Sequence, residues 1–170
     1  MTNTPKFPWE TALRTDRYDF FWGGPFSQWY PSVFMINGIQ YGCAEQYMMC
    51  GKARLFGDEE ALAEIMASDD PKTQKRIGRR VKGFDVAQWE AVARDVVREA
   101  NLAKFSQNPR LYQYIMDSGD RTIVEASPED RVWGIGRGAW EPNNEDESTW
   151  NGTNWLGEVL MQVREQLRES

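Results

Sequence analysis

The chain has 170 residues, of which 41% are hydrophobic, 13% aromatic and 27% charged. This balance is typical of a globular protein that buries a core, and it excludes an extended disordered chain. The net charge of −6 argues against a general binder of nucleic acids or anionic membranes, because both need a basic surface. The chain contains no histidine, so any catalysis would use carboxylates or lysine.

The length favours one domain. Residues 1–19 are polar with scattered aromatic side chains, and we expect them to form an N-terminal arm ahead of a domain over residues 20–170. No stretch reaches the roughly 18 apolar residues that a membrane-spanning helix needs. The N-terminus lacks the apolar segment of a signal peptide. We therefore expect a cytoplasmic protein with no membrane partner.

The first expected elements are a loop and a hairpin. Residues 20–31 are rich in aromatic residues but interrupted by glycine and proline, a composition that predicts a loop. Asn37-Gly38 then separates two apolar runs within residues 33–42, which is a strong hairpin signal.

Helical patterns dominate the rest of the chain. The clearest covers Val86 to Lys104, where apolar residues recur at a spacing of 3.6 and Asp85 with Gln88 resembles a capping box. A short buried strand is expected at Thr122–Ala126. Further helices are expected over residues 44–56 and 59–67, from Pro71, from Pro109 to near Gly119, and over residues 154–168. The expected fold class is mainly α, a single multihelical domain with a small β-hairpin and one additional short strand.

Two cysteines, Cys43 and Cys50, lie seven residues apart at the start of one expected helix. Two helical turns separate them by ~10 Å, which is too far for a disulfide. We interpret them as buried thiols. Two cysteines without histidine do not form a common zinc ligand set, so we expect no metal and no cofactor.

The segment AEQYMMCGKARLF, residues 44–56, is the first that could carry chemistry. Glu45 and Lys52 are seven residues apart and share a helix face to within ~20°. An acid and an amine pointing into one cavity would both have pKa values shifted towards neutrality by desolvation, which suits proton transfer. The alternative is an ordinary helix with a charged edge.

The segment TIVEASPEDRVWGIG, residues 122–136, is the second that could carry chemistry. Glu125 ends an apolar strand, and Asp130 precedes Trp133-Gly134. Two acids beside an aromatic ring could serve a sugar site, where one stabilises an oxocarbenium ion and the other handles a proton or water. Alternatively, Glu125 pairs with an arginine and Asp130 caps a turn. A third feature, the basic run from Lys72 to Lys82, could seat a phosphate or form a solvated helix face.

These segments, taken in order, resemble the YbiA/NADAR family. The resemblance covers about Phe20 to Leu167, and its specificity lies in the ordered spacing of the pieces. The pieces are FSQWYP, NGIQYGCAEQYMMCGKARLFGD, KRIGRRV, ANLAKFSQNP, IVEASPEDRVWGIG and GTNWLGEVLMQVREQL.

The resemblance implies a YbiA-like fold and hydrolysis of a ribosyl C1′–N bond. The favoured substrates are phosphorylated ribosylamines from early riboflavin biosynthesis. A second reading is removal of ADP-ribose from guanine bases, with nucleic acid a partner only as a modified-base substrate. A third is a non-catalytic module that binds ADP-ribose or related nucleotides. The resemblance also implies site residues: Glu45, Lys52, Glu125 and Asp130 as catalytic, Trp133 as a wall for the substrate, Ser27, Gly152 and Asn154 as pocket lining, and Arg79 as a phosphate ligand.

The chain departs from the family pattern at two places. Gln46 stands where the family often has a histidine, so that imidazole either is not essential or is replaced by the hydrogen bonds of an amide. The acidic linker Glu141–Thr149 could reshape the rim of the pocket and change the choice of substrate.

Overall fold

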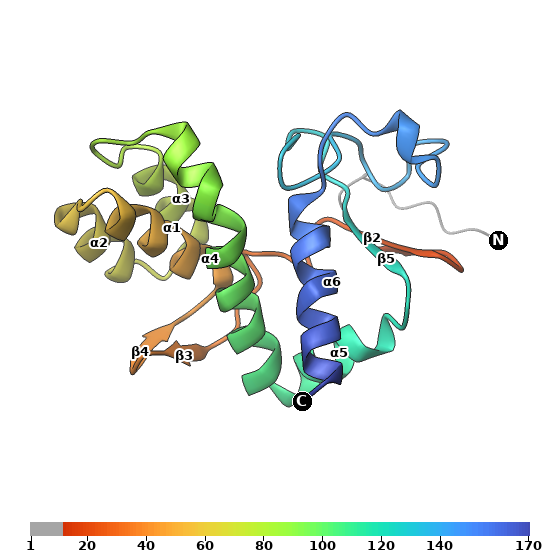
Figure 1. Cartoon of the computed structure of the whole chain (residues 1–170), viewed down its shortest axis with the longest axis horizontal. Coiled ribbons are helices and arrows are strands. Elements are labelled where there is room, and N and C mark those ends of the chain that lie inside the picture. The colour runs from red at the N-terminus through yellow and green to blue at the C-terminus, as the bar shows by residue number, and fades with distance from the viewer. Residues whose placement is uncertain (1–11) are drawn as a thin grey trace. The chain divides into compact units, whose positions relative to one another are not determined.

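The computed structural model describes residues 12–170. They fall into two compact units, which are described separately below. Unit 1 comprises the described residues up to Ser27 together with Gln113–Ser170, and unit 2 comprises Gln28–Tyr112. Figure 1 shows the elements of both units.

Unit 1 is built on a three-stranded sheet with the order β1 (Leu13–Arg14), β2 (Tyr18–Phe21) and β5 (Thr122–Glu125). β1 is antiparallel to β2, whereas β2 and β5 are parallel and end together at the pair Phe21–Glu125. Helix α6 (Trp155–Arg168) packs on β5 (Figure 1). Because parallel strands end at one edge, the segments that follow β2 and β5 leave the sheet on the same side.

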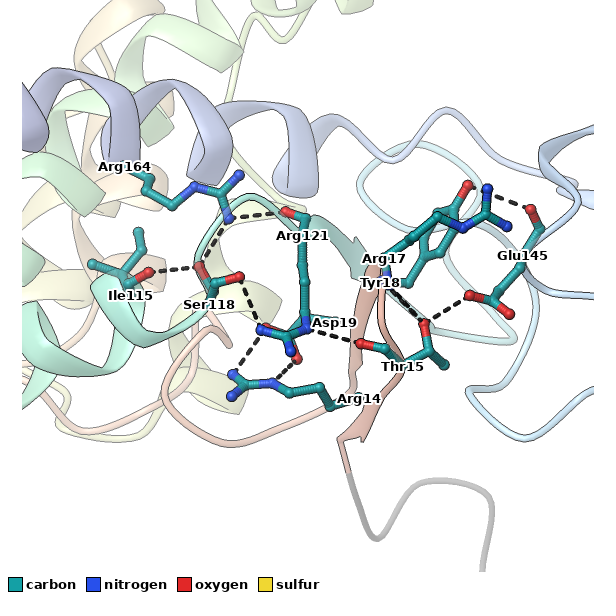
Figure 2. A network of polar contacts seen from close by, with 10 residues as sticks. All are labelled: Arg14, Thr15, Arg17, Tyr18, Asp19, Ile115, Ser118, Arg121, Glu145 and Arg164. Atoms are coloured by element: carbon teal, nitrogen blue, oxygen red, sulfur yellow. Dashed lines mark hydrogen bonds and ion pairs between the residues drawn. The ribbon is translucent and has the colours of Figure 1, made fainter.

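A polar network joins α6 to the strands of unit 1 (Figure 2). The buried Arg164 donates to Ser118 Oγ at 2.8 Å and to the Arg121 carbonyl at 2.9 Å. Arg121 in turn donates from Nε to the Thr15 carbonyl at 2.8 Å. These bonds satisfy a buried guanidinium with neutral acceptors, so the network holds the turn before β5 against both α6 and the turn between β1 and β2.

Unit 2 begins with a two-stranded hairpin, β3 (Phe34–Ile36) and β4 (Ile39–Tyr41). Asn37 and Gly38 have φ values of 53° and 78°, as the two central residues of a type I′ turn require. The hairpin expected from the sequence is confirmed.

Helices form the remainder of unit 2: α1 (Ala44–Leu55), α2 (Glu59–Met66), α3 (Pro71–Gly78) and α4 (Val86–Gln107). α1 packs against the other three. Three aspartates, Asp58, Asp70 and Asp85, cap α2, α3 and α4 by accepting a hydrogen bond from a first-turn backbone N–H. These caps explain why the helices begin where the sequence predicted. Helix α5 (Pro109–Asp117) follows, and its residues from Gln113 onward belong to unit 1.

The expectation of a mainly α fold with small β elements is confirmed. The loop predicted over residues 20–31 is wrong at its start, because Phe20 and Phe21 complete β2. The division into an arm over residues 1–19 and a domain over residues 20–170 stays a prediction. Residues 1–11 lie outside the described part, while β1 and the first half of β2 lie in the segment assigned to the arm. Between residues 12 and 170, no helix is long and apolar enough to cross a membrane.

Candidate active site

Glu45 and Lys52 both project from α1 in unit 2. Glu45 lies in the first turn and is 6% exposed, and its backbone N–H donates to the Gln28 carbonyl at 2.9 Å. Lys52 lies two turns later and is half-buried. Burial lowers the pKa of Lys52, the Glu45 carboxylate partly opposes that shift, and the positive charge of Arg79 adds to it. The charges of Glu45 and Arg79 therefore both act on the Lys52 amine, in opposite directions.

An aromatic ring completes the surroundings of Lys52. Its Nζ lies 4.4 Å from the centroid of the Phe84 ring, within the range of a cation–π contact. Phe84 is 44% exposed and packs edge-on against Phe56 at 5.5 Å. Such a ring holds the amine in place and leaves it accessible at the same time.

Gln46 occupies the position where the family often has histidine. It is 5% exposed, and its Oε1 accepts from the Gly42 N–H at 2.8 Å. Its Nε2 donates to the carbonyls of Ile65 and Ser68, both at 3.2 Å. The amide thus ties the end of the hairpin and the end of α2 to α1. Its polar atoms are occupied by backbone groups, so in this chain the position serves the fold.

Among the buried polar residues of unit 2 that the sequence analysis did not single out are Gln28, Asn101 and Lys104. Asn101 and Lys104 are both fully buried on α4. Burial lowers the pKa of Lys104 to about 7. A signal was present, because Lys104 continues the series Ala93, Val97 and Ala100 at helical spacing, and a lysine on an apolar stripe is unusual.

The two cysteines behave as the sequence predicted. Both are free and buried. Burial raises the pKa of the Cys43 thiol and raises that of Cys50 to about 11. The thiols therefore stay protonated near neutral pH, which does not suit a nucleophile.

Glu125 in unit 1 is the last residue of β5 and is half-buried. Its N–H donates to Asn154 Oδ1 at 3.0 Å, and its carbonyl accepts from the Ile135 N–H, also at 3.0 Å. Both backbone polar groups are thereby held by later parts of the chain. The carboxylate is presented from a rigid backbone position, which is what electrostatic stabilisation of a transition state needs.

Asp130 caps the turn that follows β5. Its Oδ1 accepts from the N–H groups of Val132 and Trp133 at 2.9 and 2.8 Å. The turn-capping interpretation of Asp130 is therefore confirmed. The side chain of Trp133, which this turn positions, meets Trp155 edge-on at 5.6 Å.

Gly152 and Asn154 bring the start of α6 close to the loop after β5 that contains Gly134. A Cβ on Gly152 would lie 2.3 Å from the Gly134 carbonyl oxygen, so only glycine permits this approach. Asn154 has a left-handed backbone with φ of 53°, and its Nδ2 donates to the Ile123 carbonyl at 3.0 Å. The contacts of Asn154 thus hold the end of β5 in place. The assignment of both residues to the pocket lining stays a prediction.

The structure thus gathers Glu125, Asp130, Trp133, Gly152 and Asn154 at the end of β5 in unit 1. Ser27 also belongs to unit 1, in the segment that leaves the same sheet edge after β2, where its N–H donates to the Gly24 carbonyl at 2.9 Å. The predicted site residues that lie in unit 2 are Glu45, Lys52 and Arg79.

The acidic linker lines a separate cavity of about 530 Å³ in unit 1. Thr15 Oγ1 donates to Glu145 at 2.7 Å, and the buried Asn144 donates to the Gly138 carbonyl at 2.7 Å, so the linker is fixed on the unit. The opposite wall comes from β1 and β2, including Leu13 and Phe20. None of the predicted catalytic residues lines this cavity.

Comparison with known proteins identifies the family. The NADAR domain model matches residues 20–168, which include all the predicted site residues. The chain belongs to the NADAR domain family. N-glycosidase R617 of Acanthamoeba polyphaga mimivirus is 44% identical over 167 residues, covering 91% of this chain and 98% of the relative.

Two further comparisons extend the NADAR assignment. The chloroplastic riboflavin biosynthesis protein PYRR of Zea mays is 37% identical over 94% of this chain, a region that is 26% of the maize protein. The NMR structure of Escherichia coli YbiA matches with a TM-score of 0.74 and 27% identity, covering 98% of this chain and 94% of that one. The expectation of a hydrolase that acts on N-glycosyl bonds is confirmed by relatives of the N-glycosidase class.

Proposed function

We propose that this NADAR protein is an N-glycosidase that hydrolyses the C1′–N bond of a phosphorylated ribosylamine. The observation that carries the proposal is the pair on α1, a buried Glu45 and a Lys52 whose pKa is lowered by burial and influenced by that carboxylate. The riboflavin biosynthesis name of the maize relative supports the choice of substrate class.

Each candidate has a role that its chemistry supports. The C1′–N bond breaks with oxocarbenium character, and the Glu125 carboxylate stabilises the developing positive charge. Glu45 orients the water that adds to C1′. The leaving nitrogen takes up a proton, for which Lys52 is the donor. Asp130, with Oδ1 committed to two backbone N–H groups, acts by holding the Trp133 loop.

Lys52 has two other possible roles, and they can be separated by experiment. Arg79 and Lys52 together could hold a phosphate, or the neutral amine could attack C1′ of the opened ribosylamine to form an imine. Borohydride should trap an adduct on Lys52 during turnover if the imine forms. Absence of the adduct under turnover would exclude that route and leave the other two.

Mass spectrometry of the products tests the function itself. We expect the wild-type chain to release the free amine from a 5-phosphoribosylaminopyrimidine. Glu125→Gln and Lys52→Ala should each lose about 10²–10⁴-fold in turnover while their circular dichroism stays unchanged. Glu129→Gln and Arg110→Ala remove an exposed carboxylate and an exposed cation, and both should keep wild-type turnover. Full turnover in both Glu125→Gln and Lys52→Ala would refute the assignment.

A second candidate function, removal of ADP-ribose from guanine bases, is favoured by one observation. The Nζ of Lys75 on α3 lies 5.9 Å from the ring centroid of Trp29, which is 41% exposed. Exposed rings beside cations suit single-stranded nucleic acid. Affinity for an ADP-ribosylated oligonucleotide should then fall steeply with salt, and a flat salt response would count against this reading. Saturable binding of ADP-ribose without any product would instead indicate a binding module.

A further inference from the structure

The buried face of α4 carries two polar residues where an apolar pair would stabilise the fold better. Asn101 and Lys104 are both 0% exposed and lie three residues apart, so they share one face of the helix. Their buried neighbours on α4 include Val97, Ala100 and Phe105. Buried amides and ammonium groups are costly to desolvate, and such residues are retained where they have a specific task.

Asn101 connects to Glu45 through a single residue. Its Nδ2 donates to Gln28 Oε1 at 2.9 Å and to the Val97 carbonyl at 2.8 Å. The Gln28 carbonyl in turn accepts the Glu45 N–H at 2.9 Å. Gln28 is itself 8% exposed, so this relay is shielded from water and fixes the backbone at the first turn of α1.

The amide of Asn101 is not arranged for stability alone. Its Oδ1 is buried and accepts no hydrogen bond from any residue between 12 and 170. A buried acceptor without a donor costs free energy, which an apolar side chain of the same shape would avoid. The side chain therefore keeps the relay to Gln28 at the expense of stability.

Lys104 lies on the same face of α4, and because burial lowers its pKa to about 7, its positive charge is weakened near neutral pH. Its Nζ lies 5.0 Å from the Phe105 ring centroid and 5.8 Å from that of Tyr30. The charges of Lys104 and Glu45 both act on the thiol of Cys43, the residue that precedes α1, and they act with opposite signs.

We propose that Gln28, Asn101 and Lys104 are positioning residues for Glu45. Asn101 acts through Gln28 on the backbone that carries Glu45, and Lys104 acts through its charge on the Glu45 carboxylate. This inference rests on the proposed function, in which Glu45 orients the attacking water. It adds a supporting layer on α4 that neither the motif spacing nor the names of the relatives assign.

A double-mutant cycle on kcat tests the proposal, with the 5-phosphoribosylaminopyrimidine as the probe. Asn101→Leu and Lys104→Met should each lower kcat about 10–100-fold and change KM less than about 3-fold. In a Glu45→Gln background, each should lower kcat no further, because the group on which they act is already disabled. A merely structural role would give losses that add to that of Glu45→Gln.

A matched control separates positioning from folding. Gln46→Leu removes an equally buried amide of α1 that bonds only to backbone groups, and its effect on kcat should add to that of Glu45→Gln. If Asn101→Leu does not fold, Gln28→Met probes the same relay, since it removes the Oε1 acceptor and keeps the carbonyl that holds Glu45. Its loss should likewise vanish in the Glu45→Gln background.

The outcomes are distinguishable. Additive losses in an active wild-type protein would overturn the positioning role and leave the proposed function intact. A lack of product from the wild-type chain would overturn both. Full activity of Glu45→Gln would remove Glu45 from the reaction and this inference with it, while the tests of Glu125 and Lys52 would still decide the function.

Discussion

The candidate residues of unit 1 and those of unit 2 are held in place by different means. In unit 1 they lie on strand ends and loops. The side chains of Asp130 and Asn154 form hydrogen bonds with backbone groups there. In unit 2, Glu45 and Lys52 lie on one helix, and the polar residues that support them come from other segments. Removing a side chain of unit 1 that bonds to backbone groups should therefore damage fold and activity together, whereas substitutions in unit 2 should separate the two.

The largest effect is expected for Gly152→Ala. The new Cβ would lie 2.3 Å from the Gly134 carbonyl oxygen and 2.8 Å from Arg131 backbone atoms, so two backbone segments must move apart. We expect a loss of about 3 kcal/mol or more in the free energy of unfolding, measured by urea denaturation, together with loss of turnover. Gly42→Ala, whose Cβ would meet only Gln46 at 3.8 Å, should be close to neutral. If the two variants had equal free energies of unfolding, the proposed difference between unit 1 and unit 2 would be wrong.

A smaller effect is expected at Asp130, where two variants separate capping from charge. Asp130→Ala removes the acceptor of two N–H groups and should cost about 1–3 kcal/mol. Asp130→Asn keeps an acceptor oxygen and should retain most of that stability. If Asp130 acts only by holding the Trp133 loop, Asp130→Asn should also keep most of the turnover. A stable but inactive Asp130→Asn would assign the carboxylate a direct part in the chemistry.

The smallest effect concerns the pH dependence of stability at Lys52. Burial lowers its pKa in the folded chain below the ordinary 10.5. Between those two values the unfolded chain binds more protons than the folded chain, so stability rises with pH there. The Tm of the wild-type protein relative to Lys52→Met should therefore increase from pH 7 to pH 10. Because Lys52 is only half-buried, we expect the change to stay within about 1 kcal/mol. An opposite slope would contradict the lowered pKa.

Local signals in the sequence identified most elements. Asn37-Gly38 marked the hairpin because its turn needs two residues with positive φ, and the Asp85 cap marked the start of α4. The β1–β2–β5 sheet was not foreseen as one sheet. β1 and β2 are two and four residues long, too short to show a periodicity, and the expected strand β5, which pairs with β2, lies about 100 residues further along the chain, where no local pattern indicates the pairing.

The sequence alone determined the helix face that Glu45 and Lys52 share, because helical spacing is a local property. Tertiary structure decided how Asp130 and Asn154 use their polar atoms, and that Gln46 bonds to backbone groups at both ends of its amide. It also decided that Asn101 and Lys104 of α4 are fully buried and that Asn101 bonds to Gln28. Hydrogen-bond partners and desolvation come from residues far apart in the chain, and no local pattern records which of them will meet.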